Sequence, residues 1–129
     1  MSPMRLTRSL FLVILLVVTA VGQEAMLKLP SGKQVKVIKT GPIYNNTTFK
    51  KLGFVIQYET ELPISDVARL REEAGQVFEA CKPQMEKQKE TDVIISATTK
   101  PTGLILKKTD SYSFVHQKKE DGKWALLSK

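Results

Sequence analysis

The sequence predicts an α+β fold, with one kinked amphipathic helix packed on an antiparallel meander sheet and a β-hairpin at the N-terminal side. Short runs of alternating apolar and polar residues lie on both sides of one long segment, whose apolar residues recur at three- and four-residue steps. Glycine, proline, asparagine or aspartate separates most of these runs. A helix with one apolar face has to cover that face, so we expect it to lie across one side of the sheet.

The first residues of the chain have the pattern of a secretory signal peptide. Arg5 and Arg8 precede an apolar run over residues 10–21. In helical form this run is about 18 Å long, whereas the hydrocarbon core of a bilayer is roughly 30 Å thick. Small residues follow the run, as at a signal-peptidase cleavage point, and we expect cleavage near Ala20 to Gly22.

The chain is therefore divided into a predicted signal peptide, residues 1–22, and a single α+β domain, residues 23–129. The second part is long enough for one hydrophobic core and too short for two. We expect a periplasmic or secreted protein, with membrane contact only through residues 1–22 if they are retained. Retention of this segment as a membrane anchor is the alternative.

The cysteine content and the charge limit the classes of protein to which this chain can belong. Cys81 is the only cysteine, so the chain forms no internal disulfide. Small secreted eukaryotic domains are commonly rich in disulfides, so this composition favours the bacterial periplasm. The net charge is +7, and the excess is uneven, because residues 23–58 hold six lysines and one glutamate.

Residues 27–37 are expected to form a hairpin, since leucines alternate with lysine before a Pro-Ser-Gly-Lys turn and valines alternate with lysines after it. We expect Gly41 and Pro42 to break the strand pattern, and residues 45–48 to form a polar turn. The next strand, residues 52–60, should place on one face Phe54, Ile56 and Tyr58.

The helix is predicted over residues 65–82. Ser65 or Asp66 is suited to cap its N-terminus by accepting a hydrogen bond from a backbone N–H. Pro83 removes one backbone bond and clashes with the preceding turn, which costs about 3 kcal/mol in a regular helix, so we expect a kink there and a frayed tail. The apolar stripe consists of Val67, Leu70, Ala74, Val77, Phe78, Cys81 and Met85.

Four strands are expected after the helix, at residues 92–99, at residues 104–108 and as two strands within residues 111–127. Consecutive strands joined by tight turns favour an antiparallel meander. A helix followed by such a meander is similar to the layout of cystatin-like and NTF2-like proteins. This is a likeness of layout only, and a shared fold does not carry function.

The last two strands are joined by a Glu-Asp-Gly turn that allows two registers. A two-residue loop pairs His116 with Leu127, whereas a three-residue loop with Gly122 in the left-handed conformation pairs His116 with Leu126. A slip by one residue moves every side chain to the other face of the sheet. The second register keeps the aromatic side chains together, so we prefer it, and it places His116 beside Trp124.

The candidate binding site consists of His116, the only histidine, Trp124, the only tryptophan, and Tyr112. A histidine beside aromatic side chains could be a general base or a ligand contact near neutral pH. A metal would need further converging ligands, and nucleophilic catalysis would need an activated serine or cysteine; the sequence places neither near His116. We therefore favour a core position for these residues, and predict no catalytic residue, metal or cofactor.

For three further groups of residues, we compare a functional role with a purely structural one. One candidate is a basic patch for anionic polymers or lipid headgroups, formed by Lys33, Lys36 and Lys39. Lysines on a strand also keep its solvent-exposed face soluble, which is the structural alternative. Cys81 lies on the apolar stripe of the helix, where a buried thiol is inert. Glu59 and Glu61 share a strand face two residues apart, and we expect them at a solvated edge and not in an acid–base site.

The expected function is that of an exported, non-catalytic binding or accessory module of the bacterial envelope. Glycine-rich phosphate loops, zinc-binding patterns and the nucleophile elbow are missing from the sequence. The expected partner is another envelope protein or a small ligand, and export argues against nucleic acid. The alternatives are a basic surface that binds anionic polymers or lipid headgroups, and a small enzyme with a pocket between helix and sheet.

Overall fold

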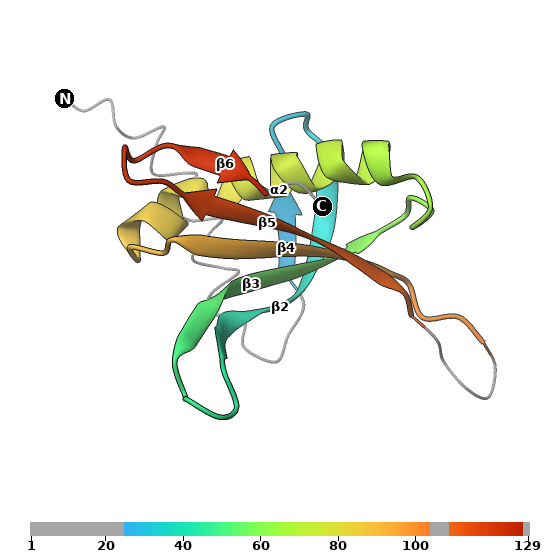
Figure 1. Cartoon of the computed structure of the whole chain (residues 1–129). Helices are drawn as coiled ribbons and strands as arrows, with labels where there is room; N and C mark the ends of the chain where they lie inside the picture. Colours follow the sequence, from blue (N-terminus) through green and yellow to red (C-terminus); the bar gives the residue numbers. More distant parts are fainter. Residues whose placement is uncertain (1–24, 104–108, 128–129) are drawn as a thin grey trace.

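The computed structural model describes residues 25–103 and 109–127. Within them, one six-stranded sheet has the order β1-β2-β3-β4-β5-β6, and helix α2 lies on one face of it (Figure 1). This confirms an α+β fold with one helix packed on a sheet. The predicted signal peptide and the predicted strand at residues 104–108 lie outside the described residues. The elements are β1 (Ala25–Lys28), β2 (Gln34–Tyr44), β3 (Lys51–Thr60), α2 (Val67–Lys87), β4 (Asp92–Thr99), β5 (Ser111–Lys118) and β6 (Trp124–Leu126).

The sheet is mixed, which corrects the prediction of an antiparallel meander. β3 and β4 run parallel, with Phe54 opposite Val93 and Thr60 opposite Thr99. All other neighbouring strands are antiparallel. Helix α2 connects the parallel pair, and a crossover of this length returns the chain in its original direction. Three strands precede the helix, so the cystatin-like or NTF2-like layout is not confirmed.

The N-terminal hairpin forms as predicted, with Leu27 opposite Val35. The predicted break at Gly41 and Pro42 is wrong, because β2 continues through both residues to Tyr44. Strand β1 pairs with Gln34–Val37, and within residues 25–103 and 109–127 no other strand pairs with that edge of β2. A proline, which lacks an N–H, is tolerated on such an edge strand.

Helix α2 begins after Asp66, whose side chain accepts a hydrogen bond from the backbone N–H of Arg69. The predicted end at residue 82 is wrong, because the helix continues through Pro83 to Lys87. Met85 is buried against the sheet, and this packing offsets the backbone bond that the proline removes. A kink at Pro83 stays a prediction. In residues 25–103 and 109–127 no helix is both long and apolar enough to cross a membrane.

The C-terminal hairpin has the preferred register. His116 lies opposite Leu126, Lys118 lies opposite Trp124, and Gly122 has a φ of 85°. Only a residue without a Cβ adopts this backbone conformation readily, so Gly122 determines the three-residue loop and thereby the face on which each side chain lies.

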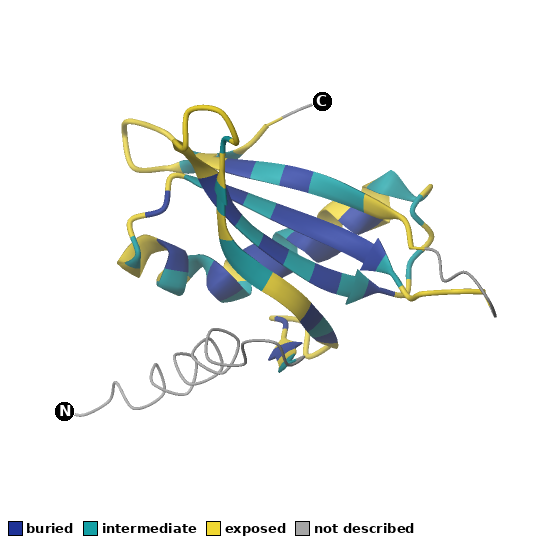
Figure 2. Cartoon of the chain, turned by 90° about the horizontal axis from the view of Figure 1, so that it is seen from below, coloured by how far each residue is buried: buried dark blue, intermediate teal, exposed yellow. Residues whose placement is uncertain are grey.

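The hydrophobic core fills the layer between α2 and the inner face of the sheet, and Figure 2 shows buried residues alternating with less buried ones along the strands. The buried face of the helix carries six of the predicted apolar residues, while Val67 is only partly buried. The polar side chains that share this layer with the core include Glu73, which is 6% exposed, and His116, which is 8% exposed.

Candidate functional site

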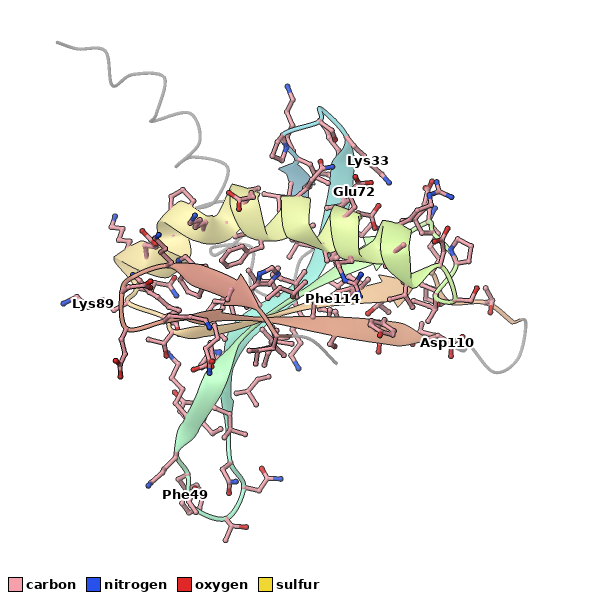
Figure 3. The ribbon with its side chains drawn as sticks, turned by 45° about the horizontal axis from the view of Figure 1, so that its top comes forward. Lys33, Phe49, Glu72, Lys89, Asp110 and Phe114 are labelled. Carbon is pink, nitrogen blue, oxygen red and sulfur yellow. The ribbon has the colours of Figure 1, made fainter. Side chains whose placement is uncertain are left out.

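Glu73 lies on the buried face of α2 and is surrounded by hydrogen-bond donors. Its Oε1 accepts hydrogen bonds from the hydroxyls of Tyr58, at 2.9 Å, and Thr60, at 2.6 Å. Its Oε2 accepts one from the ammonium of Lys33, which reaches from the β1–β2 turn toward the helix (Figure 3). We call these four residues the Glu73 centre.

The charge state of the Glu73 centre follows from these contacts. Burial alone would raise the pKa of Glu73, but the hydrogen bonds from Lys33, Thr60 and Tyr58 and the charge of Lys33 outweigh it and lower the pKa. Burial, and then the charge and hydrogen bond of Glu73, raise the pKa of Tyr58 far above its usual value. The carboxylate is therefore ionised and the phenol protonated at neutral pH.

The Glu73 centre has a structural role, because it links three parts of the fold. Three hydrogen bonds occupy most of the acceptor positions of the carboxylate, so little capacity is left for a ligand. The contacts join the β1–β2 turn, strand β3 and helix α2 at one point. Sequence reasoning did not identify Glu73 as a buried residue. The signal was present, because Glu73 lies three residues after Leu70 and four before Val77.

A cavity of about 740 Å³ opens beside the Glu73 centre. Side chains of both charges line it, namely Lys33, Lys36, Lys100, Glu59, Glu61 and Glu73. The Lys100 ammonium lies 3.3 Å from the Glu61 carboxylate, and both side chains are exposed, so the pair contributes little to stability. Because its lining combines both charges, no single kind of ligand is indicated for this cavity.

A second cavity, of about 470 Å³, lies between α2 and the β5–β6 hairpin. Its aromatic wall consists of Phe78, His116 and Trp124, and we call it the aromatic cleft. The imidazole of His116 stacks on the ring of Phe78, with ring centres 4.1 Å apart and planes within 5°. The indole of Trp124 meets the same phenyl ring edge-on at 5.1 Å. The sequence-predicted pair, His116 and Trp124, is thus brought together in one cavity.

One ring nitrogen of His116 lacks a hydrogen-bond partner in the described part of the chain. Its Nε2 is buried and has no hydrogen-bond partner among the described residues. Burial lowers the pKa of the imidazole, so the ring is neutral at pH 7. A neutral imidazole has one N–H donor and one acceptor nitrogen, and it can offer either to a ligand.

Charged side chains surround the aromatic cleft. Trp124 donates its indole N–H to Glu86 at 2.8 Å, and Lys118 lies 3.7 Å from the same carboxylate and 5.7 Å from the centre of the indole ring. The hydrogen bond from Trp124 and the nearby lysines lower the pKa of Glu86, although the carboxylate is exposed. The remaining charged residues that line the cleft are Glu79, Lys82 and Lys123.

The other predicted site residues lie elsewhere. Tyr112 packs on Phe114 further along β5, with ring centres 5.0 Å apart, and does not line the aromatic cleft. Of the three lysines in the predicted basic patch, Lys33 and Lys36 line the cavity beside the Glu73 centre, where the ammonium of Lys33 binds Glu73, and Lys39 is not part of that lining.

Two negative findings complete the description of the site. Burial raises the pKa of the Cys81 thiol to about 12, so it stays a protonated thiol. No cluster of three or more metal-binding side chains exists in the described part of the chain.

Comparison with known proteins gives no match, since no protein family, curated protein or solved structure is significantly similar to this chain.

Proposed function

We propose that this chain is an exported, non-catalytic binding module of the bacterial envelope, and that the aromatic cleft holds its ligand or partner. The observation that carries the proposal is the buried, unpartnered Nε2 of His116 in the wall of the cleft. A buried polar atom without a partner costs about 1–3 kcal/mol, and folded proteins retain few of them. A ligand that supplies the missing hydrogen bond explains why the imidazole is retained at this position.

The cleft suits a planar aromatic or heteroaromatic group with a hydrogen-bonding edge. Its volume of about 470 Å³ is within the range of small-molecule sites, which combine apolar walls with a few placed polar groups. Phe78 and Trp124 supply rings for stacking, and His116 supplies the polar atom. The group can belong to a small molecule or to an aromatic side chain of another envelope protein.

Access to His116 requires a local movement. Nε2 is buried, whereas Trp124 is half-buried and belongs to the three-residue edge strand β6. We expect the indole to move aside when a ligand binds, which would break its hydrogen bond to Glu86. Trp124 is the only tryptophan, so its fluorescence reports on this cleft alone.

The test is a titration of the full chain with planar heteroaromatic fragments and with short peptides that contain tyrosine or phenylalanine, followed by tryptophan emission. We expect a saturable change in emission and a rise in the thermal midpoint at high ligand concentration. Gly75 lines the cleft, and a Cβ at this position meets nothing within 4 Å. Gly75→Leu should therefore fold and block binding, while Gly75→Ala should weaken it less.

The matched control is Glu72→Leu, which adds the same side chain to an exposed position of the same helix outside the cleft. It should leave the titration unchanged. An identical response in Gly75→Leu and in the unaltered chain would overturn the cleft as the binding site, and so would a failure of every fragment and peptide to change the emission.

A small enzyme is the second candidate, because His116 shares the cleft with two carboxylates, Glu79 and Glu86. A neutral imidazole can take a proton from a water molecule. However, Glu86 is already occupied by Trp124 and Lys118, and no serine, threonine or cysteine lines the cleft. A hydrolytic activity that survives purification and disappears in His116→Ala would favour this candidate over the binding module.

A further inference from the structure

The hairpin formed by β2 and β3 extends away from the helix–sheet body, and Phe49 lies at its end (Figures 1 and 3). Three large apolar side chains near this end face solvent: Tyr44 is 54% exposed, Phe49 is 79% exposed and Leu52 is 52% exposed. Together with Lys50 and Lys51 we call them the β2–β3 tip. Isolated exposed apolar residues are ordinary, but three in one protruding turn form a candidate contact surface.

The turn that carries Phe49 is rigidly built. The backbone N–H of Asn45 donates to the carbonyl of Lys50, and the N–H of Phe49 donates to the carbonyl of Asn45. The side-chain oxygen of Asn45 accepts hydrogen bonds from the N–H groups of Thr47, at 2.8 Å, and Thr48, at 2.9 Å. This confirms the polar turn predicted at residues 45–48 and shows that the tip has a defined shape.

The residue at position 49 is unfavourable for folding. Phe49 has a φ of 60°, in the left-handed region that non-glycine residues rarely adopt. An asparagine or glycine would fit this backbone better and would expose no ring to water. Neither packing nor backbone preference within the described residues therefore accounts for a phenylalanine at this position.

The charges around the tip indicate the chemistry of a contact at this candidate surface. Between Lys39 and Glu59 the sequence contains two lysines and no acidic residue. Lys51 binds the carboxylate of Glu90 at 2.7 Å, while Lys50 makes no ion pair in the described part of the chain. The surface that meets the tip should therefore be apolar beneath a negatively charged layer.

We propose that the β2–β3 tip docks on a membrane that contains anionic lipids, with Phe49 entering the interface and Lys50 meeting the headgroups. Aromatic rings favour the interfacial region of a bilayer, and basic side chains are attracted to anionic lipids. A protruding turn lets the tip reach a flat surface without moving the body (Figure 1). This contact uses a different surface from the aromatic cleft and does not depend on a ligand there.

The experiment places a fluorescent reporter at the tip of the full chain. The double variant Phe49→Trp/Trp124→Phe moves the only tryptophan to the tip, so its emission is insensitive to membrane contact made by residues 1–22. We expect a blue shift on addition of phosphatidylglycerol vesicles, quenching by brominated acyl chains, and reversal by salt. Phosphatidylcholine vesicles should give a much smaller shift.

Three further single variants of the unaltered chain, compared by vesicle cosedimentation, separate the two components of binding. Phe49→Asn, which also fits the positive φ, should weaken binding to phosphatidylglycerol vesicles about tenfold. Lys50→Glu should weaken it about thirtyfold at low salt, because it removes a positive charge and adds a negative one. Met26→Asn is the matched control, since Met26 is as exposed as Leu52 but lies on β1, and it should change nothing.

Unchanged emission while the chain still sediments with vesicles would overturn the proposal, because binding would then use another segment. Equal, salt-independent shifts with both lipids would overturn the requirement for anionic headgroups. A shift that occurs only with a lipid-free extract of envelope proteins would replace the membrane with a protein partner and would equally contradict the proposal.

Discussion

Glu73 and His116 are both polar, both more than nine-tenths buried, and both packed in the layer between α2 and the sheet. They differ in their surroundings. The carboxylate of Glu73 accepts three hydrogen bonds, two from strand β3 and one from the β1–β2 turn. The Nε2 of His116 makes no hydrogen bond to any described residue.

This difference in hydrogen bonding indicates different roles for the two residues, although they lie in the same layer. A buried charge is tolerated when its partners satisfy it, and the Glu73 centre is satisfied by the chain itself. The imidazole of His116 has a stacking neighbour but no partner for one nitrogen, so the chain leaves a hydrogen bond to be completed from outside. We therefore assign Glu73 to stability, whereas binding through His116 is the proposed role.

The largest change in the free energy of unfolding is expected for a substitution of Glu73. Glu73→Ala should lower the free energy of unfolding by about 3 kcal/mol, because the hydroxyls of Tyr58 and Thr60 lose their shared acceptor in a buried position. Denaturant unfolding measures this loss. Glu72→Ala, at the neighbouring exposed position, is the control and should stay within about 0.5 kcal/mol of the unaltered chain.

The two residues should also titrate in different pH ranges. The folded pKa of His116 lies below its unfolded value of 6.5, so the unfolded chain binds more protons and stability falls as the pH drops below about 6.5. The folded pKa of Glu73 lies below 4.5, so its contribution is lost as the pH falls from about 4.5 through that lower pKa. His116→Phe should flatten the first range only and Glu73→Gln the second only. The reverse assignment would contradict the account.

A smaller effect, of opposite sign, is expected at His116. His116→Phe keeps a planar ring against Phe78 and removes the unpaired nitrogen, so stability at pH 7 should stay unchanged or rise by up to about 1 kcal/mol. The same variant should lose ligand binding in the cleft. A loss of stability similar to that of Glu73→Ala would show that Nε2 has a partner within the folded chain.

The smallest effect is expected at Glu61, whose partner Lys100 is exposed as well. Glu61→Gln should change the free energy of unfolding by less than about 0.5 kcal/mol, although Glu61 and Glu73 line the same cavity. A change above 1 kcal/mol would mean that the stabilising charges extend beyond the Glu73 centre.

Local patterns predicted the elements well, and long-range pairing poorly. The alternation along β3, the stripe on α2 and the loop that ends in Gly122 each depend on neighbouring residues, and all three are confirmed. The parallel pairing of β3 with β4 and the continuation of β2 through Pro42 depend on which strands lie alongside. Periodicity contains no information about that neighbour, so these features were missed.

The candidate site was predicted in part for the same reason. The hairpin register placed His116 beside Trp124, but the third ring, Phe78, comes from the helix and depends on tertiary packing. Tyr112 shares a strand face with His116 yet lies too far along β5 to reach the cleft. The contact between Lys33 and Glu73 joins residues 40 positions apart, and no local pattern predicts it.

The most direct test of the central claim is nitrogen-15 NMR of the imidazole, since the full chain contains a single histidine and its signals need no assignment. At pH 7 the account predicts a neutral ring whose Nε2 shows no hydrogen bond, and a change in that nitrogen's shift when a planar heteroaromatic fragment is added. An Nε2 that is already hydrogen-bonded in the ligand-free chain, or that no fragment perturbs, would contradict the assignment of the aromatic cleft as a binding site.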